Sequence, residues 1–286
     1  MIDHIKPTKP HRDLVKFAAG TVFVLGLIWS QFCVGETYVF SAPPRETAED
    51  GQKDYGPIAE FLTKATGRRF IYRHSNNWLS YMKDMRTGKY DLIFDGPHFV
   101  SWRVTRLGHT PLVRVQGKLD FVIVARNNDD VVFDLSDLAG HKVCAHAPPN
   151  LATLTMQTQF TNPVRQPQIF EVNGFNNIFA ELLKGNCRGA VIPSALYATF
   201  NNGDTKGKTR ILYLSESLPR QAITSGPRIP ENIQTVIRTT LLSPQGLVAT
   251  KRLRERFADG EQMVATNKDE YQGFATLLNN LYGFGW

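Results

Sequence analysis

The chain has 286 residues, of which 42% are hydrophobic and 21% charged, with 22 Gly and 16 Pro. This balance is typical of a packed globular protein of one or two domains, and it excludes a disordered chain, a collagen and a coiled coil. The formal charge is +7, but residues 1 to 35 carry +2 and the remaining +5 is spread without a basic run or nucleic-acid-binding motif. We therefore expect no nucleic-acid partner, while a mildly basic surface suits an anionic ligand.

The first 35 residues have the pattern of an export signal. A basic leader over residues 6 to 16 precedes an uncharged, largely apolar stretch over residues 17 to 34. Small residues at Cys33 and Gly35 predict cleavage before Glu36, which would release a periplasmic protein. The alternative is that residues 17 to 34 stay as an inner-membrane anchor. Gln31 and Phe32 before Cys33 do not fit a lipoprotein signal.

Two cysteines remain after such a cleavage, Cys144 and Cys187. The oxidising periplasm favours a disulfide between them, and the alternative is that both are small buried hydrophobic residues. Their places in the expected strands oppose a bridge, because Cys144 lies inside one strand and Cys187 just before another. A bridge needs α-carbons within about 7 Å.

The region from residue 37 to residue 96 has a βαβαβ pattern. Asp54 and Pro57 predict the start of the first helix, and Gly67 its end. The second helix is predicted by Trp78, Tyr81, Met82 and Met85, whose spacing of three to four residues is typical of a core-facing helix side. Strands are expected over residues 37 to 42, 68 to 74 and 90 to 96.

A third helix is expected over residues 97 to 107, followed by two strand-like runs, 110 to 117 and 118 to 126, with no helix between them. This interrupts the alternation of strands and helices. After a polar turn at residues 127 to 130 the alternation begins again. The expected strands are 142 to 147, 168 to 172, 190 to 193 and 210 to 214, and the expected helices include 135 to 140, 151 to 160 and 176 to 184.

These elements predict an α/β protein of two lobes joined by hinge strands. Lobe one comprises residues 37 to 125 plus 216 to 286, and lobe two comprises residues 126 to 215. Ligands of open parallel sheets bind beyond the carboxyl ends of the strands. The loops expected at such a cleft are 41 to 54, 74 to 77, 95 to 98, 147 to 155, 173 to 177 and 193 to 194.

Several short motifs occur together in a characteristic order. They are Tyr55-Gly56-Pro57-Ile58, Thr66-Gly67, the run from Arg86 to Ile93 that leads to Gly96-Pro97, the run from Leu135 to Val143, and Pro149-Asn150. In these motifs the chain resembles the periplasmic substrate-binding proteins of phosphate, phosphite and phosphonate ABC transporters. The resemblance implies a bilobal clamshell of the type II periplasmic-binding-protein fold. It also implies a solute-binding protein for a phosphonate-like oxyanion or small organic anion, with an ABC transporter permease as its partner.

The same resemblance implies a ligand contact from Tyr55 and from hydroxyls in the loop after Asn150. Three positions depart from the family pattern, one of them Cys187-Arg188-Gly189, which stands where an acidic residue is expected. Asp95 stands where an aromatic residue is common, and a carboxylate there would repel an anion unless it is protonated or paired with a cation. Gly174-Phe175 stands where a histidine is expected, which suits a less polar ligand. The candidate ligand-binding residues are Tyr55, Asp95, Gly96, His98, Asn150, Thr153, Thr155, Phe175 and Asn176.

Other functions receive less support from the sequence. Asp95, His98 and His74 lack the dense spacing of metal ligands, and the enzyme motifs GxSxG, HExxH and the Walker loop do not occur. We therefore expect no metal, no cofactor and no enzymatic activity, and we expect a monomer. The main alternative is a membrane-anchored periplasmic sensor or accessory subunit that uses the same clamshell.

Overall fold

The computed structural model describes residues 36–285. The predicted signal peptide or anchor over residues 1 to 35 lies outside these described residues. Within the described part, no helix combines the length and apolar character needed to cross a bilayer.

The first lobe is built on a mixed six-stranded sheet, in the order β13-β4-β12-β3-β1-β2. Strands β2, β1 and β3 are parallel, whereas β12, β4 and β13 join as antiparallel neighbours. The strands are β1 (Thr37–Ser41), β2 (Arg69–Tyr72), β3 (Leu92–Asp95), β4 (Thr110–Val115), β12 (Ala222–Ser225) and β13 (Met263–Ala265). The last 70 residues therefore add β12 and β13 to the sheet that the N-terminal region begins.

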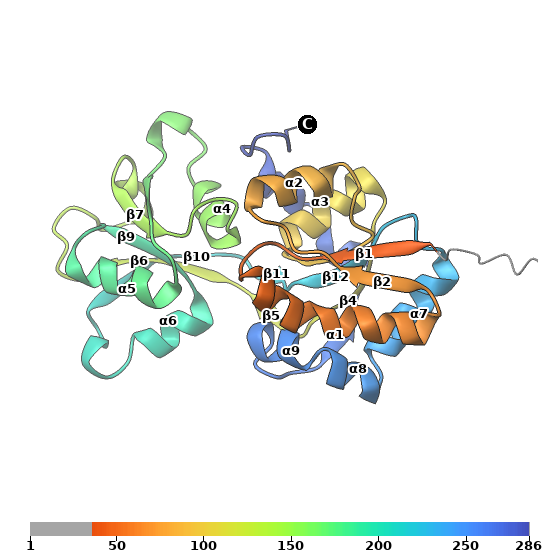
Figure 1. The fold of residues 1–286 in the computed structure, drawn as a ribbon. Helices are drawn as coiled ribbons and strands as arrows, with labels where there is room; N and C mark the ends of the chain where they lie inside the picture. Colours follow the sequence, from red (N-terminus) through yellow and green to blue (C-terminus); the bar gives the residue numbers. More distant parts are fainter. Residues whose placement is uncertain (1–35, 286) are drawn as a thin grey trace, which may run out of the picture. The chain divides into compact units, whose positions relative to one another are not determined.

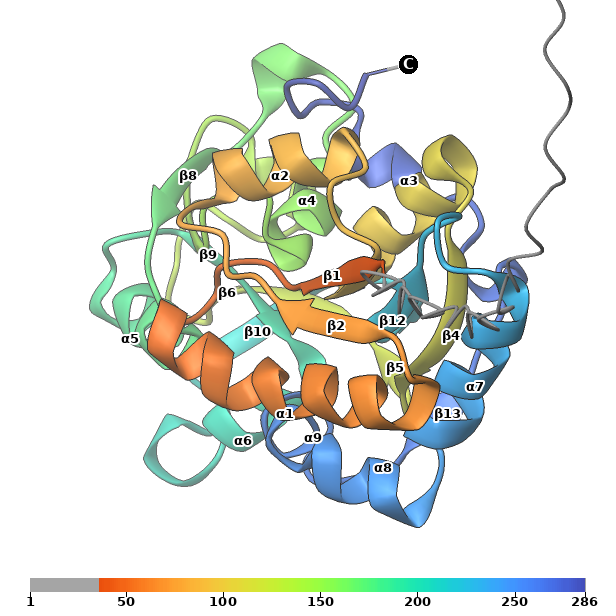
Figure 2. The same ribbon diagram turned by 45° about the vertical axis from the view of Figure 1, so that its right-hand side comes forward.

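Helices cover both faces of this sheet (Figures 1 and 2). They are α1 (Ala48–Thr66), α2 (Trp78–Arg86), α3 (Pro97–Leu107), α7 (Glu231–Leu241), α8 (Pro244–Ala249) and α9 (Lys251–Phe257). Side chains alternate along β1: Tyr38 and Phe40 pack in the cluster with α1 and α7, while Val39 packs in the cluster with α2 and α3. This alternation explains why a nearly continuous apolar strand can be buried on both sides.

The second lobe has a five-stranded sheet in the order β10-β6-β9-β7-β8. Its strands are β6 (Phe121–Arg126), β7 (Lys142–Ala145), β8 (Gln168–Glu171), β9 (Gly189–Pro193) and β10 (Thr209–Leu214), and its helices are α4 (Leu151–Gln157), α5 (Phe175–Lys184) and α6 (Ser194–Phe200). Phe121 and Ile123 of β6 pack in the cluster with α4, and Val122 and Val124 pack in the cluster with α5 and α6. The prediction of an α/β fold is confirmed.

Two boundaries differ from the sequence expectation. Helix α1 begins at Ala48 rather than near Asp54, because the hydroxyl of Thr47 accepts the backbone N–H of Asp50 at 3.1 Å and caps the helix there. Pro57 consequently lies inside the helix. The expected limit of lobe one at residue 125 falls within β6, and β6 pairs with β9 and β10 of the second sheet.

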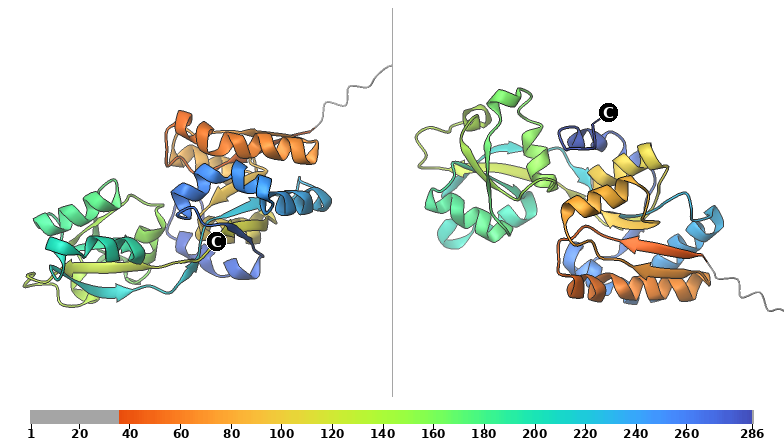
Figure 3. Two further views of the ribbon diagram at one scale, coloured as in Figure 1. Left: turned by 90° about the horizontal axis from the view of Figure 1, so that it is seen from below. Right: turned by 45° about the horizontal axis from the view of Figure 1, so that its top comes forward.

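Two chain segments cross between the lobes (Figure 3). In these crossings β5 (Lys118–Leu119) pairs antiparallel with β11 (Leu218–Pro219). A third connection is made by packing: the 3-10 turn η5 (Phe274–Leu278) supplies Ala275 and Leu278 to a cluster that also holds Leu154 of α4. The C-terminal segment thus contacts both lobes.

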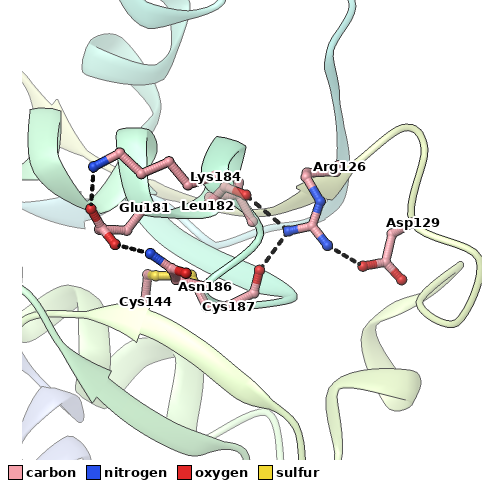
Figure 4. Close-up of a disulfide and its surroundings, with 8 residues drawn as sticks. All are labelled: Arg126, Asp129, Cys144, Glu181, Leu182, Lys184, Asn186 and Cys187. Atoms are coloured by element: carbon pink, nitrogen blue, oxygen red, sulfur yellow. Dashed lines mark hydrogen bonds and ion pairs between the residues drawn. A yellow bond between two sulfur atoms is a disulfide. The ribbon is translucent and has the colours of Figure 1, made fainter.

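A disulfide joins Cys144 of β7 to Cys187, with their α-carbons 5.7 Å apart (Figure 4). The backbone N–H of Arg188 donates to the carbonyl of Lys142 at 2.9 Å, so the chain already runs beside β7 before β9 begins. Cys187 therefore lies beside Cys144 even though it precedes its strand, and the bridge can form. Arg126 fixes the same turn by donating to the carbonyls of Leu182 and Cys187 at 2.8 and 2.7 Å.

Candidate ligand-binding site

A cavity of about 580 Å³ lies between the two lobes. This size falls in the usual range for small-molecule sites. Most of its lining comes from the loops that follow parallel strands, together with residues of the crossings and of α9. The lining residues are Pro44, Arg45, Trp78, Gly96, His98, Leu119, Phe121, His146, Ala147, Pro149, Asn150, Leu151, Ala152, Asn173, Gly174, Phe175, Pro193, Gln221 and Phe257.

The wall from lobe one centres on the start of α3. No side chain caps this helix, and Gly96 is its N-cap residue. A β-carbon on Gly96 would lie 2.8 Å from the ring of His98, so the close approach of that ring requires glycine. Gly96 and His98 at the start of α3 therefore line the cavity together, while Pro97 between them has no N–H to offer.

His98 is 3% exposed and lines the cavity. Burial lowers its pKa to about 3, and the ring is therefore neutral at physiological pH. Neither ring nitrogen makes a hydrogen bond of normal geometry, although the carbonyl of Pro149 lies close enough to favour the protonated form. A neutral imidazole with free nitrogens can donate one hydrogen bond to a ligand and accept another.

Asp95 is not available to a ligand. Its carboxylate accepts two hydrogen bonds from Arg103 at 2.6 and 2.8 Å and one from the hydroxyl of Tyr81 at 2.5 Å, and all of these groups are buried. The prediction that Asp95 contacts the ligand therefore has no support in the structure. Because a cation already neutralises it, this carboxylate does not repel an anion in the cavity.

The wall from lobe two is formed by the starts of α4 and α5. The side chain of Asn150 caps α4 by accepting the N–H of Ala152 at 3.0 Å. Thr153 donates its hydroxyl to the carbonyl of His146 at 2.7 Å, so it fixes the loop and does not line the cavity. Helix α5 has no side-chain cap, and its first residue, Phe175, packs edge-on against His146 with ring centroids 4.7 Å apart.

Three further candidates do not line the cavity. Tyr55 is fully buried in lobe one, where its ring contacts Phe40, Tyr72 and Phe94. Thr155 is buried and Asn176 is exposed. Of the nine candidates, the structure therefore brings together Gly96, His98, Asn150 and Phe175.

Several lining residues were not among the candidates. Arg45 lies in an expected cleft loop, but nothing in the local sequence distinguishes it from other surface arginines. Trp78 belongs to the expected core stripe and is only half-buried, with part of its surface on the cavity. Gln221 and Phe257 come from parts of the chain that carried no cleft prediction. Its place in an expected cleft loop is therefore the one signal that points to Arg45, whereas Phe257 reaches the cavity only through the packing of α9.

A wider depression of about 820 Å³ lies beside the start of α1. The acidic and basic side chains that line this depression largely pair with one another. Asp54 binds Arg252 and Arg256 at 2.7 and 3.0 Å, and Glu46 pairs with Arg256 at 3.0 Å. Within residues 36–285, no three His, Cys, Asp or Glu side chains gather as a metal site would require.

Comparison with known proteins points to one family. Residues 40–271 match the model of a family described as the phosphonate periplasmic substrate-binding proteins of ABC transporters. In a search of curated proteins, no sequence matches the chain.

Solved structures show the same fold at low sequence identity. A Xanthomonas citri protein bound to ATP has a TM-score of 0.67 and 13% identity, covering 85% of this chain and 97% of that one. PhnD1 from Prochlorococcus marinus in complex with methylphosphonate has a TM-score of 0.63 and 10% identity, covering 86% and 98%. A binding protein of an ABC phosphonate transporter from Pseudomonas aeruginosa has a TM-score of 0.57 and 11% identity, covering 83% of each chain.

Proposed function

This chain belongs to the family of periplasmic substrate-binding proteins of phosphonate ABC transporters, and from that premise we propose that it captures a small anion between its two lobes. Members of this family are solute-binding components of transporters and not enzymes. The captured anion would be delivered to the permease of an ABC transporter in the inner membrane.

The observation that carries the proposal is the cavity between the lobes. Arg45 and the start of α3 come from one lobe, and the start of α5 comes from the other. Neither helix has a side-chain cap, so the N–H groups of their first turns, other than the α3 position that Pro97 occupies, are free to bind negative charge. Closure of the lobes would bring both helix ends onto one ligand, which is how a bilobal protein couples binding to closure.

The related structures support an anionic ligand. The Prochlorococcus protein was solved with methylphosphonate and the Xanthomonas protein with ATP, and both molecules carry negative charge. Their identity to this chain is too low to transfer either ligand.

A thermal-shift screen of the purified protein tests the proposal. Phosphate, phosphite, methylphosphonate and a set of small organic acids are added one at a time. A ligand at one hundred times its Kd adds about 2.7 kcal/mol to the stability, which is easily detected. We expect at least one anion to raise the Tm, and we expect Arg45→Gln to weaken that effect. Exposed Arg69, which does not line the cavity, supplies the matched control Arg69→Gln. If no anion raises the Tm, the proposal is wrong.

The location and assembly of the protein form a second part of the proposal. The family is periplasmic, and we propose that the exported protein is a monomer cleaved after Gly35. The intact mass of protein recovered from the periplasm tests the cleavage, because retention of residues 1 to 35 would leave the full-length mass. Light scattering tests the monomer.

A further inference from the structure

The chemical types of the lining residues indicate which class of small anion the cavity would bind. Among the described residues that line the cavity, none is Ser, Thr or Tyr, and none is Asp or Glu. Four are aromatic, two from each lobe: Trp78 and Phe257 from lobe one, and Phe121 and Phe175 from lobe two. A tetrahedral oxyanion needs many donors, and hydroxyl groups are the usual side-chain source, whereas this cavity offers broad apolar faces.

Arg45 is the one formal cation among these described lining residues. Its guanidinium lies 5.4 Å from the ring centroid of Phe257, which orients it. Its Nη1 atom is buried and has no hydrogen-bond partner. The neighbouring carboxylate of Glu46 is paired with Arg256 at 3.0 Å. One side of a planar, bidentate donor is therefore left for a ligand.

Two further buried polar groups of the cavity wall lack partners. Both ring nitrogens of His98 and the Oε1 atom of Gln221 are buried without a hydrogen bond of normal geometry. Because a buried polar group without a partner costs free energy, these atoms mark where polar groups of a ligand would bind. These unpartnered polar atoms are few compared with the aromatic side chains of the lining.

The absence of acidic side chains excludes a second class of ligand. An amino acid or other zwitterion brings an ammonium group, and burial of that charge requires an anionic or strongly polar partner. The described lining offers no carboxylate for it. With one guanidinium and otherwise neutral side chains, the lining balances one negative charge.

We propose that this cavity binds an organic monoanion with a flat apolar body, such as an aromatic carboxylate, in preference to a phosphorus oxyanion or an amino acid. The carboxylate pairs with Arg45, and the ring lies among Trp78, Phe121 and Phe175. This inference rests on the proposed function, since it names the class of anion that the same site takes.

Isothermal titration of the full exported protein tests the inference with named probes. The aromatic carboxylates are benzoate, phenylacetate and indole-3-acetate. The comparison compounds are methylphosphonate, phosphate, acetate and phenylalanine. We expect at least one aromatic carboxylate to bind at least tenfold more tightly than every comparison compound.

Two variants separate the charge from the apolar surface. Arg45→Gln should weaken binding of the aromatic carboxylate at least tenfold, whereas Arg69→Gln should leave it unchanged. Phe175→Ala should also weaken it severalfold, while circular dichroism and the Tm of the free protein show that the variant is folded.

The outcomes distinguish this inference from the broader proposal. If methylphosphonate or phosphate binds more tightly than every aromatic carboxylate, and Arg45→Gln weakens that binding, the inference is wrong and the proposed function stands. If phenylalanine binds most tightly, the inference is wrong because the site accepts a zwitterion. If none of the probes binds, the inference is wrong, and the wider thermal-shift screen decides the proposed function separately.

Discussion

The two lobes share an α/β plan, but different chemistry holds the loop after β3 in lobe one and the turn before β9 in lobe two. In lobe one, the loop after β3 is held by ionised side chains, because buried Asp95 binds Arg103, which also donates to Thr224 at 2.9 Å. In lobe two, a disulfide ties β7 to the turn before β9, and Arg126 binds backbone carbonyls of that turn. The comparison shows that a buried ion pair holds the loop after β3, whereas a disulfide holds the turn before β9, although lobe two also contains a buried carboxylate, Asp129, paired with Arg126 and Arg188.

The largest expected effect comes from breaking the buried ion pair. Arg103→Met leaves the Asp95 carboxylate buried without its cation, which should cost about 3–5 kcal/mol of unfolding free energy. Burial alone would lower the pKa of Arg103, but Asp95 holds that pKa above its usual value, so the guanidinium stays protonated. Urea unfolding measures the loss.

A matched control for this prediction is the exposed pair Lys53–Glu49, which also has a short distance of 2.6 Å. Lys53→Met should cost less than about 1 kcal/mol. The double variant Asp95→Asn/Arg103→Met should be more stable than Arg103→Met alone. Equal losses for Arg103→Met and Lys53→Met would contradict the role of buried charge in lobe one.

The disulfide should give the next largest effect. Cys144 and Cys187 are 43 positions apart in sequence, and the chain-entropy model assigns a loop of this size a stabilisation of about 4 kcal/mol, with a typical measured range of about 2–4 kcal/mol. The variant Cys144→Ala/Cys187→Ala should lose that amount in urea unfolding. Reductant should destabilise the wild type and leave the variant unchanged; a reductant effect on both would argue against the bridge as its cause.

Buried histidines should make stability depend on pH. The folded-state pKa of His98 is lowered to about 3 by burial, below the ordinary value of 6.5, with Asp95 nearby raising it and Arg45 lowering it. The unfolded state therefore binds more protons between these values, and stability should rise with pH across this window by up to about 1.4 kcal/mol per pH unit. Buried His109, whose pKa is also lowered by burial and by Arg103, acts in the same direction.

The variant His98→Gln tests this contribution through urea midpoints measured from pH 4 to pH 7. Its stability should change less steeply with pH than that of the wild type. Asn176→Ala, at an exposed position, should keep the wild-type slope. The same slope in His98→Gln and the wild type would show that His98 is not held neutral.

The smallest effect is expected from the hydroxyl that fixes the lobe-two loop. Thr153→Val removes the 2.7 Å bond to the carbonyl of His146 and should cost about 1 kcal/mol. Thr239, which donates to the carbonyl of Thr235 at 3.0 Å on the exposed side of α7, supplies the control Thr239→Val, with an expected change within about 0.5 kcal/mol. Equal changes in both variants would mean that the Thr153 hydrogen bond stabilises the protein no more than an exposed one does.

Much of the fold could be predicted because each element carries its own periodic signal. The apolar strand around Phe40, the glycine stop at Gly67 and the helical stripe from Trp78 to Met85 are local patterns. The start of α1 was misplaced because Asp54 and Pro57 together imitate a helix start. The true cap at Thr47 uses one side-chain hydrogen bond, which many threonines in loops could form.

The candidate site was predicted less completely, for a different reason. Gly96, His98, Asn150 and Phe175 follow predicted strands, and strand ends in a parallel sheet meet at one edge. Asp95 follows the same rule, but Arg103, farther along α3, reaches back and binds its carboxylate. This contact makes Asp95 unavailable to a ligand. Thr153 is diverted in the same way by the carbonyl of His146.

By itself the sequence determined the α/β class, the succession of elements and the loops that could reach a cleft, because these follow from local periodicity and turn chemistry. Only the tertiary structure decided which polar groups stay free for a ligand, since each such group is satisfied or left unsatisfied by partners distant in sequence. Arg45 and Phe257 illustrate this: they are more than 200 residues apart, and the packing of α9 beside the loop before α1 brings the ring under the guanidinium.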